Sequence, residues 1–253
     1  MLLVLLGLAV AVLVLATQTG CTPQDSTPNE PETGDNDQVK TEAEITEQLV
    51  EASLEVALEE FNTTSTVHSS NNPLSLSQML DNSNVIREYL TDAGWSVNAI
   101  SALLANMVSE STINPGRWQD GVGPGYGLVQ WDPATKYTNW ANAEGYSEDG
   151  MVGQLERILL EVSVDGSGSP WDDNLNQWQG FRVSPSVSFQ EFTTCDDKSA
   201  YDLAIDFMLC YERPADKSEQ AKDHRGKNAE QFYNYFINGT TPELKDKNGN
   251  LYK

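Results

Sequence analysis

A glutamate at the end of an apolar helical pattern is the residue of this chain best suited to acid catalysis. Glu110 closes that pattern, and helix-breaking residues follow at once in Asn114-Pro115-Gly116. A short distance further on, the chain reads Gly125-Tyr126-Gly127-Leu128-Val129-Gln130-Trp131. A carboxyl at the rim of a buried helical face, opposite a loop of glycines and aromatic rings, has the surroundings needed to protonate a glycosidic oxygen.

The position of Glu110 on its helix predicts how readily its carboxyl ionises. At about 100° per residue, the apolar side chains form one stripe and Glu110 lies at its edge, in the last turn. The negative end of the helix dipole disfavours ionisation there, and partial burial acts in the same direction. Both effects predict a raised pKa for Glu110, which suits a general acid at neutral pH. The alternative is an ordinary surface glutamate at a fraying helix end.

The elements that must position this residue are predicted to be helical. Apolar residues recur with helical spacing in six segments, namely 81–92, 97–110, 133–143, 150–163, 198–211 and 217–238. Ser96 is a suitable N-cap for the segment that carries Glu110. Residues 112–131 are expected to be loop or short extended segments, and 164–196 are ambiguous. The sequence therefore predicts a mainly α fold.

Four motifs in a fixed order resemble the phage tail-tip lysozyme family of the lysozyme superfamily. They are Gly94-Trp95-Ser96, Asn106-Met107 with Glu110-Ser111-Thr112-Ile113-Asn114-Pro115, Gly123-Pro124-Gly125-Tyr126-Gly127-Leu128-Val129-Gln130-Trp131, and Tyr211-Glu212-Arg213-Pro214. The resemblance covers roughly 81–238. It implies a lysozyme-like α+β fold, with a minor β/loop region beside the catalytic helix. It also implies a peptidoglycan hydrolase that cleaves between N-acetylmuramic acid and N-acetylglucosamine.

The resemblance also implies roles for particular residues. Glu110 would protonate the glycosidic oxygen. A sugar would be contacted by the residues of the aromatic loop, with Gln130 binding an acetamido or hydroxyl group and an aromatic ring facing a pyranose. The predicted contacts are Tyr126, Gly127, Gln130 and Trp131, together with Tyr211 as an orienting residue near Glu110. Trp131 could instead be an ordinary core residue, and Glu212 with Arg213 is expected to form a structural pair.

The second carboxylate of a glycosidase is harder to assign. Inverting enzymes place an acid and a base roughly 6.5–9.5 Å apart, and retaining enzymes place the two groups about 5–5.5 Å apart. Asp120 and Asp132 flank the aromatic loop and are the candidates. Asp132 could instead cap the helix that begins near Pro133. Hydrolysis and closure of the sugar on itself, as in lytic transglycosylases, are both compatible with the sequence.

Charge and composition divide the chain into segments. Of the formal net charge of −23, residues 22–60 contribute −11, which argues against a nucleic-acid partner. Four segments are predicted: a signal peptide or membrane anchor at 1–20, an acidic disordered tether at 21–80 with a possible helix at 41–61, a lysozyme-like catalytic domain at 81–240, and a polar tail at 241–253.

The N-terminal segment predicts export. Residues 2–16 are an apolar run, and Thr19-Gly20-Cys21 resembles the end of a bacterial lipobox. Lipid on Cys21 and an uncleaved anchor remain alternatives, and both would tether the chain at the outer face of a bacterial cytoplasmic membrane. The remaining cysteines, Cys195 and Cys210, can form a disulfide that stabilises by roughly 3 kcal/mol, or remain buried free thiols.

Other chemistries have little support in the sequence. His68 and His224 lack the spacing of zinc ligands, so no metal is expected. Cys195 is flanked by aspartates, which disfavour a reactive thiolate, and no phosphate-binding glycine loop occurs. No cofactor is therefore predicted. The alternative to an enzyme is a non-catalytic cell-wall-binding or assembly module of a secretion or conjugation apparatus.

Overall fold

The structure, a computed structural model, describes residues 66–164 and 176–253. These residues belong to a compact unit that spans Ser65–Lys253. The predicted signal or anchor at 1–20, Cys21 and the predicted helix at 41–61 lie outside the described residues. Among the described residues, no helix is long and apolar enough to cross a membrane.

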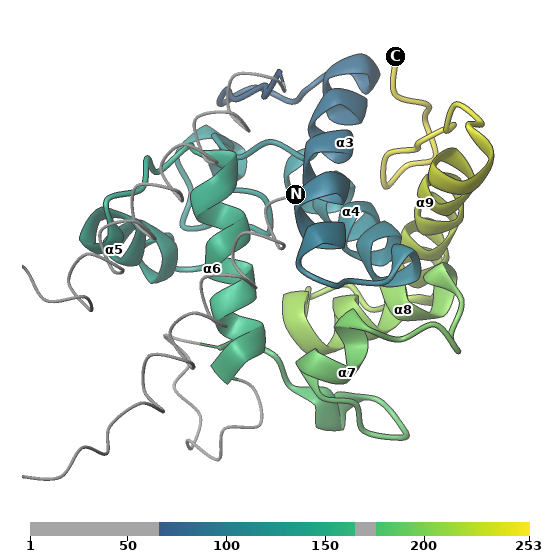
Figure 1. Ribbon diagram of the computed structural model, residues 1–253. Coiled ribbons are helices and arrows are strands. Elements are labelled where there is room, and N and C mark those ends of the chain that lie inside the picture. The colour runs from purple at the N-terminus through teal and green to yellow at the C-terminus, as the bar shows by residue number, and fades with distance from the viewer. Residues whose placement is uncertain (1–65, 165–175) are drawn as a thin grey trace, which may run out of the picture. The chain divides into compact units, whose positions relative to one another are not determined.

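The fold is mainly helical, as the sequence predicted (Figure 1). The helices are α3 (Leu76–Asp92), α4 (Val97–Ser111), α5 (Thr135–Glu144), α6 (Met151–Val164), α7 (Phe189–Thr193), α8 (Ala200–Phe207) and α9 (Glu219–Asn238). Three short helical turns are η1 (Gln119–Gly121), η2 (Gly180–Arg182) and the π-helical η3 (Met208–Glu212), which continues α8. All six predicted helices are present, and α7 lies in the segment that the sequence left ambiguous.

The minor β region is small. Between α4 and α5, the described residues form only isolated antiparallel bridges, which join Trp118 to Tyr126 and Tyr126 to Trp131. The hydroxyl of Ser111, at the end of α4, donates to the carbonyl of Leu128 over 2.9 Å. The loop that contains the bridges is thereby attached to the end of the helix that carries Glu110.

Helix α4 forms the centre of the core. Its residues from Ala99 to Val108 are buried, and α8 and α9 pack against it and against each other. Gly226 permits the close approach of α9 to α8, because a Cβ at this position would lie 2.4 Å from the ring of Tyr201. This packing brings the middle of α9 beside the C-terminal end of α4, where Glu110 lies.

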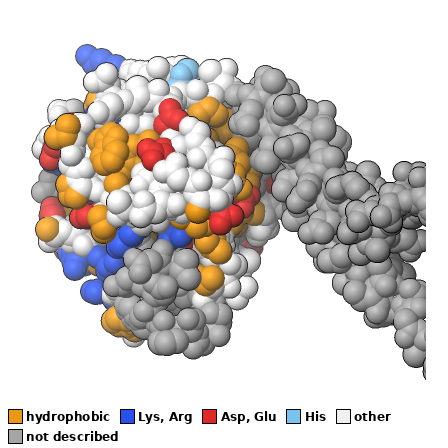
Figure 2. Space-filling model, turned by 90° about the vertical axis from the view of Figure 1, so that its left-hand side faces the viewer, with side chains coloured by type: hydrophobic (Ala, Val, Ile, Leu, Met, Phe, Trp, Pro, Cys, Tyr) orange, Lys and Arg blue, Asp and Glu red, His pale blue; other side chains and the backbone are white. Residues whose placement is uncertain are grey.

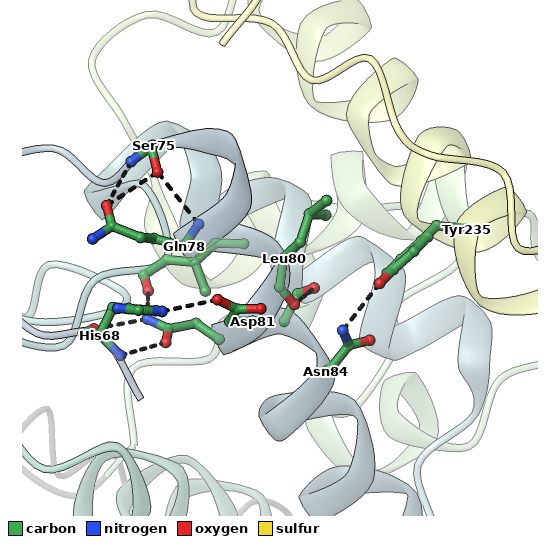
Figure 3. Close-up of polar contacts among 10 residues, drawn as sticks. His68, Ser75, Gln78, Leu80, Asp81, Asn84 and Tyr235 are labelled. Atoms are coloured by element: carbon green, nitrogen blue, oxygen red, sulfur yellow. Dashed lines mark hydrogen bonds and ion pairs between the residues drawn. The ribbon is translucent and has the colours of Figure 1, made fainter. Parts of the chain in front are cut away.

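The segment before α3 is folded onto the domain. Asn82, on α3, exchanges hydrogen bonds with the backbone of His68 over 2.8 Å, and its amide also donates to the carbonyl of Ile113. His68 is half-buried and bonds Asp81 over 2.9 Å, whereas the sequence predicted a disordered tether here (Figure 3). The folded unit thus extends N-terminal to the predicted boundary at residue 81.

The two ends of the described domain also meet. The amide of Leu76 donates to the carbonyl of Lys253 over 2.9 Å, and Lys245 forms a β-bridge with Leu251. Asn84 of α3 donates to the hydroxyl of Tyr235 of α9 over 3.0 Å (Figure 3). The segment predicted as a polar tail, 241–253, is therefore part of the folded unit.

Exposed apolar side chains are dispersed. In the face shown in Figure 2, hydrophobic side chains occur in separate groups among polar ones. The large hydrophobic residues with the most exposed side chains come from different segments, namely Val122, Phe181, Ile237 and Leu251.

Candidate functional site

Glu110 lies in the last turn of α4 and is bound by an arginine from α9. Its Oε1 accepts a hydrogen bond from Nη2 of Arg225 over 2.7 Å. The Glu110 side chain is 21% exposed and that of Arg225 is 9% exposed, so the pair borders solvent from a largely buried position. A guanidinium stabilises the ionised form of a carboxylate. The sequence prediction did not include this arginine, because nothing local links residues so far apart in the chain.

The backbone turns sharply after Glu110. Helix α4 ends at Ser111, and both Thr112 and Ile113 have left-handed backbone angles, with φ of 59° and 54°. Left-handed angles are strained for a β-branched residue, and local bonds hold them. The hydroxyl of Ser111 accepts from the amide of Asn114 over 3.2 Å, and the amide of Ile113 donates to the carbonyl of Met107.

Gln154 of α6 joins the aromatic loop to the loop that follows Glu110. Its Oε1 accepts from the amide of Leu128 over 2.7 Å, and its Nε2 donates to the carbonyls of Pro115 and Glu148. Gly127 is needed here, because its φ is +81° and a Cβ would lie 2.6 Å from Oε1 of Gln154. The glycine thus admits a buried glutamine, whereas the sequence reasoning expected it to admit a sugar.

Three of the predicted sugar contacts are buried. Tyr126, Trp131 and Tyr211 are 3%, 1% and 1% exposed. The indole of Trp131 donates to Glu161 over 3.1 Å and stacks on Tyr137. Burial does not fit the predicted contact of these rings with a pyranose, and it favours the alternative that Trp131 is a core residue.

The remaining predicted contact, Gln130, is half-buried and binds its own loop. Its Nε2 donates to the carbonyls of Arg117 and Gly127 over 3.0 and 2.8 Å. Trp118 is also half-buried, and its ring centroid lies 4.6 Å from that of Tyr126. Trp118 is therefore the tryptophan of this loop that keeps a solvent-accessible surface.

The two predicted second carboxylates lie on the exposed surface. Asp120 is in η1 with φ of 48°, and Asp132 follows Trp131. Asp132 is not the N-cap of α5, because the cap is Ala134 and makes no side-chain bond. The carboxyl that interacts with Glu110 electrostatically is instead Glu212.

Glu212 ends the π-helical turn η3. The residue is partly accessible, but its Oε1 is buried. Burial and the neighbouring Glu110 raise the pKa of Glu212 well above that of an ordinary glutamate, while Arg225 and Arg213 oppose the rise. Arg213 Nη1 also donates to the carbonyl of Cys210 over 3.3 Å. The sequence had assigned Glu212 to a structural pair, whereas in the structure the charge of Glu110 contributes to the raised pKa of Glu212.

A third carboxyl, Glu161 of α6, is fully buried. It accepts from Arg157 over 3.2 Å, from Trp131, and from the amide of Gln177 over 3.3 Å. Burial raises the pKa of Glu161, and these donors partly offset the rise. These contacts join α6 to the aromatic loop and to the segment before η2, so we interpret Glu161 as structural.

The described cysteines form no disulfide. Cys195 and Cys210 are free thiols in the structure, so the predicted disulfide is absent. Cys210 is buried, which raises its pKa to about 12, whereas Cys195 is half-buried in the turn after α7. Within residues 66–164 and 176–253, no group of His, Cys, Asp and Glu has the arrangement of a metal site.

Comparison with known proteins agrees with this fold. Residues 81–236 match the phage tail lysozyme family. Over 170 residues, or 66% of this chain, the sequence is 44% identical to Morphogenesis protein 1 of Bacillus phage B103. The chain spans only 42% of that relative. The mainly helical fold is consistent with a lysozyme-like domain, and the chain belongs to the phage tail lysozyme family.

Proposed function

We propose that this domain cleaves the glycan strand of peptidoglycan between N-acetylmuramic acid and N-acetylglucosamine, with Glu110 as the general acid. The observation that supports this most is the position of Glu110. It is a partly exposed carboxyl at the end of a buried helix, in a chain of the phage tail lysozyme family. A general acid must reach both solvent-borne substrate and a source of protons, and this position permits both.

The sugar contacts in this proposal differ from those suggested by the sequence. Trp118 can offer a ring face to a pyranose, because it is half-exposed in the loop attached to α4. Trp131 and Tyr126, which belong to the same loop, are buried beneath its solvent-facing side. Trp118→Ala should therefore weaken binding of soluble glycan fragments while leaving thermal stability close to that of the wild type.

The test of the proposal is digestion of purified peptidoglycan. Glu110→Gln keeps the hydrogen bond with Arg225 but cannot donate a proton as an acid, so it should release no muropeptides. Glu88→Gln, an exposed glutamate on α3, is the matched control and should retain full activity. Retained activity of Glu110→Gln would overturn the assignment. Mass spectrometry distinguishes hydrolysis, which leaves a reducing muramic end, from transglycosylation, which leaves an anhydro end.

A second candidate function is binding to the cell wall without cleavage, as part of an envelope or assembly apparatus. The Arg225–Glu110 pair favours it, because the carboxylate is already occupied by a cation. The name of the similar phage B103 protein, which refers to morphogenesis, is compatible with it. Sedimentation of the protein with purified cell wall, without any loss of turbidity, would support this function over the enzymatic one.

We further propose that the N-terminal segment exports the chain and tethers it to the membrane, through lipid on Cys21 or through the apolar run at 2–16. Cells that express the full chain can be labelled with a radioactive fatty acid. Label that is lost in Cys21→Ala would identify a lipoprotein, and an unlabelled chain in the membrane fraction would identify an anchor. Recovery of the chain entirely in the soluble fraction would contradict both.

A further inference from the structure

Residues 68–74 form a strap, an irregular segment ahead of α3 that lies across two loops of the candidate site. None of these residues, all of which the structure describes, lies in a helix or a strand, so the position of the strap depends on hydrogen bonds to other parts of the chain. At one end, the backbone of His68 is bonded to Asn82 of α3. From there the strap meets the loop that follows Glu110 and then the turn η1, which begins after Trp118.

The first contact of the strap is with the loop that follows α4. Asn114, which is fully buried, accepts from the amide of Ser70 over 3.0 Å and donates to the carbonyl of Asn72 over 2.7 Å. The hydroxyl of Thr112 accepts from the amide of Leu74 over 2.9 Å. Side chains of this loop therefore satisfy backbone groups that regular secondary structure would otherwise pair.

Gly116 leaves the space that the strap occupies. Its φ is not positive, so the backbone conformation does not require a glycine here. A Cβ at this position would lie 2.5 Å from Oγ of Ser69 and 3.1 Å from the amide nitrogen of Ser70. The close approach of the strap is therefore the reason for a glycine at this position.

The second contact of the strap is made by Asn71, at the turn η1. Its Oδ1 accepts from the amide of Trp118 over 3.0 Å, and its Nδ2 donates to the carbonyl of Gly121 over 2.9 Å. The backbone carbonyl of Asn71 also accepts from Nη1 of Arg117. The side chain of Asn71 is thus bonded to both ends of the stretch that runs from Trp118 to Gly121.

This stretch has little other support on its outer side. None of the residues of η1 is buried, and Val122, which follows the turn, is 91% exposed. On its inner side, Trp118 is joined to Tyr126 by an isolated β-bridge and by contact of the two rings. An exposed turn opens locally with ease unless hydrogen bonds attach it to the rest of the fold. The bonds from Asn71 therefore restrict the movement of Trp118.

We propose that the strap positions Trp118 for sugar binding, with Asn71 as the positioning residue. Asn71 fixes the backbone of Trp118, so that its ring presents one face to a pyranose. Without these bonds, the turn would have to become ordered as the glycan binds, and the cost of that ordering would weaken binding. Residues required for glycan binding therefore begin ahead of the region 81–236 that matches the family. This inference rests on the proposed function.

Kinetics on soluble glycan strands, freed of their peptides, test this role in the full chain. Asn71→Ala removes two exposed hydrogen bonds, so KM should rise about 3- to 10-fold while kcat stays close to that of the wild type. Asn238→Ala, at the exposed end of α9, is the control and should leave both constants unchanged. In the Trp118→Ala background, Asn71→Ala should raise KM no further. An unchanged KM in Asn71→Ala, or an equal rise in both backgrounds, would overturn the proposal.

Amide hydrogen exchange, measured by nuclear magnetic resonance, tests the same role without substrate. In Asn71→Ala, the amide of Trp118 loses its acceptor and should exchange about 3- to 10-fold faster. The amide of Gly145, at the end of α5, should exchange as in the wild type. Unchanged exchange at Trp118 would also overturn the proposal. The proposed function fails separately, when Glu110→Gln remains active. An inactive Glu110→Gln beside an Asn71→Ala variant with wild-type KM and exchange would refute the role of the strap alone.

Discussion

Replacing Gly127 by alanine tests whether the buried Gln154 contact organises the loop beside Glu110. Gly127 has a φ of +81°, and an added Cβ would lie 2.6 Å from Oε1 and 2.9 Å from Cδ of Gln154. The end of a glutamine side chain can often move aside. This one is fully buried and holds hydrogen bonds to Leu128, Pro115 and Glu148, so moving it disturbs all of them.

Gly145 provides a matched control for the energetic cost of placing alanine at a positive φ. It has a φ of +80°, and a Cβ there would meet nothing within 4 Å. Alanine at either position carries the cost of a left-handed residue, about 1–2 kcal/mol. Gly127→Ala should add about 1–3 kcal/mol, since each weakened hydrogen bond contributes about 0.5–1.5 kcal/mol. The two alanine variants should therefore differ clearly in stability.

Urea unfolding of both variants, alone and combined with Gln154→Ala, separates the cost of the backbone conformation from the cost of the clash with Gln154. In the Gln154→Ala background, the cost of Gly127→Ala should fall to that of Gly145→Ala, because the clash has been removed. Gly127→Ala should also reduce muropeptide release, since the same loop is bonded to Ser111 beside Glu110. Equal costs for Gly127→Ala and Gly145→Ala, or no coupling to Gln154, would refute the reasoning.

Three further variants probe the buried charges. Arg225→Met should destabilise by about 1.5–3 kcal/mol in urea unfolding, because Glu110 loses a charge-assisted hydrogen bond. Folding raises the pKa of Glu212, so the free energy of unfolding should fall as the pH rises above the ordinary glutamate range. In thermal melts, the stability of Glu212→Gln should depend less on pH over this range than that of the wild type. Trp131→Phe removes the donor to buried Glu161 and should lower stability by about 1.5–3 kcal/mol without changing the cleavage products identified by mass spectrometry.

Local periodicity was sufficient to predict the helices of this domain. The apolar spacing at 97–110 predicted α4, and Ser96 is its N-cap, accepting from the amide of Ala99. Helix α3 begins at Leu76, earlier than predicted, because Ser75 and Gln78 form a capping box ahead of the apolar pattern. The segment before it has no periodicity, and long-range hydrogen bonds hold it on the fold, among them those to Asn82, Asn114 and Thr112.

The site was less predictable than the fold, because its key contacts are long-range. Glu110 and Arg225 come from α4 and α9, and no local pattern pairs them. The aromatic residue types of the loop predicted sugar contacts, but the same rings also fill a core, and Trp131 found a buried acceptor in Glu161. Residue type alone does not distinguish a ring that faces solvent from one that covers a buried carboxyl.

The π turn η3 gives a geometric reason why helical periodicity could place Glu110 but not Glu212. Periodicity assumes that each residue advances by about 100° around the axis. That holds through α4, but after Phe207 the chain changes to a wider turn, in which the amide of Arg213 donates to the carbonyl of Met208, five residues back, over 2.8 Å. The wider turn alters the direction of every side chain after it. Glu212, at the end of this turn, therefore does not take the direction that continuing the pattern of 198–211 as a regular α-helix would give it.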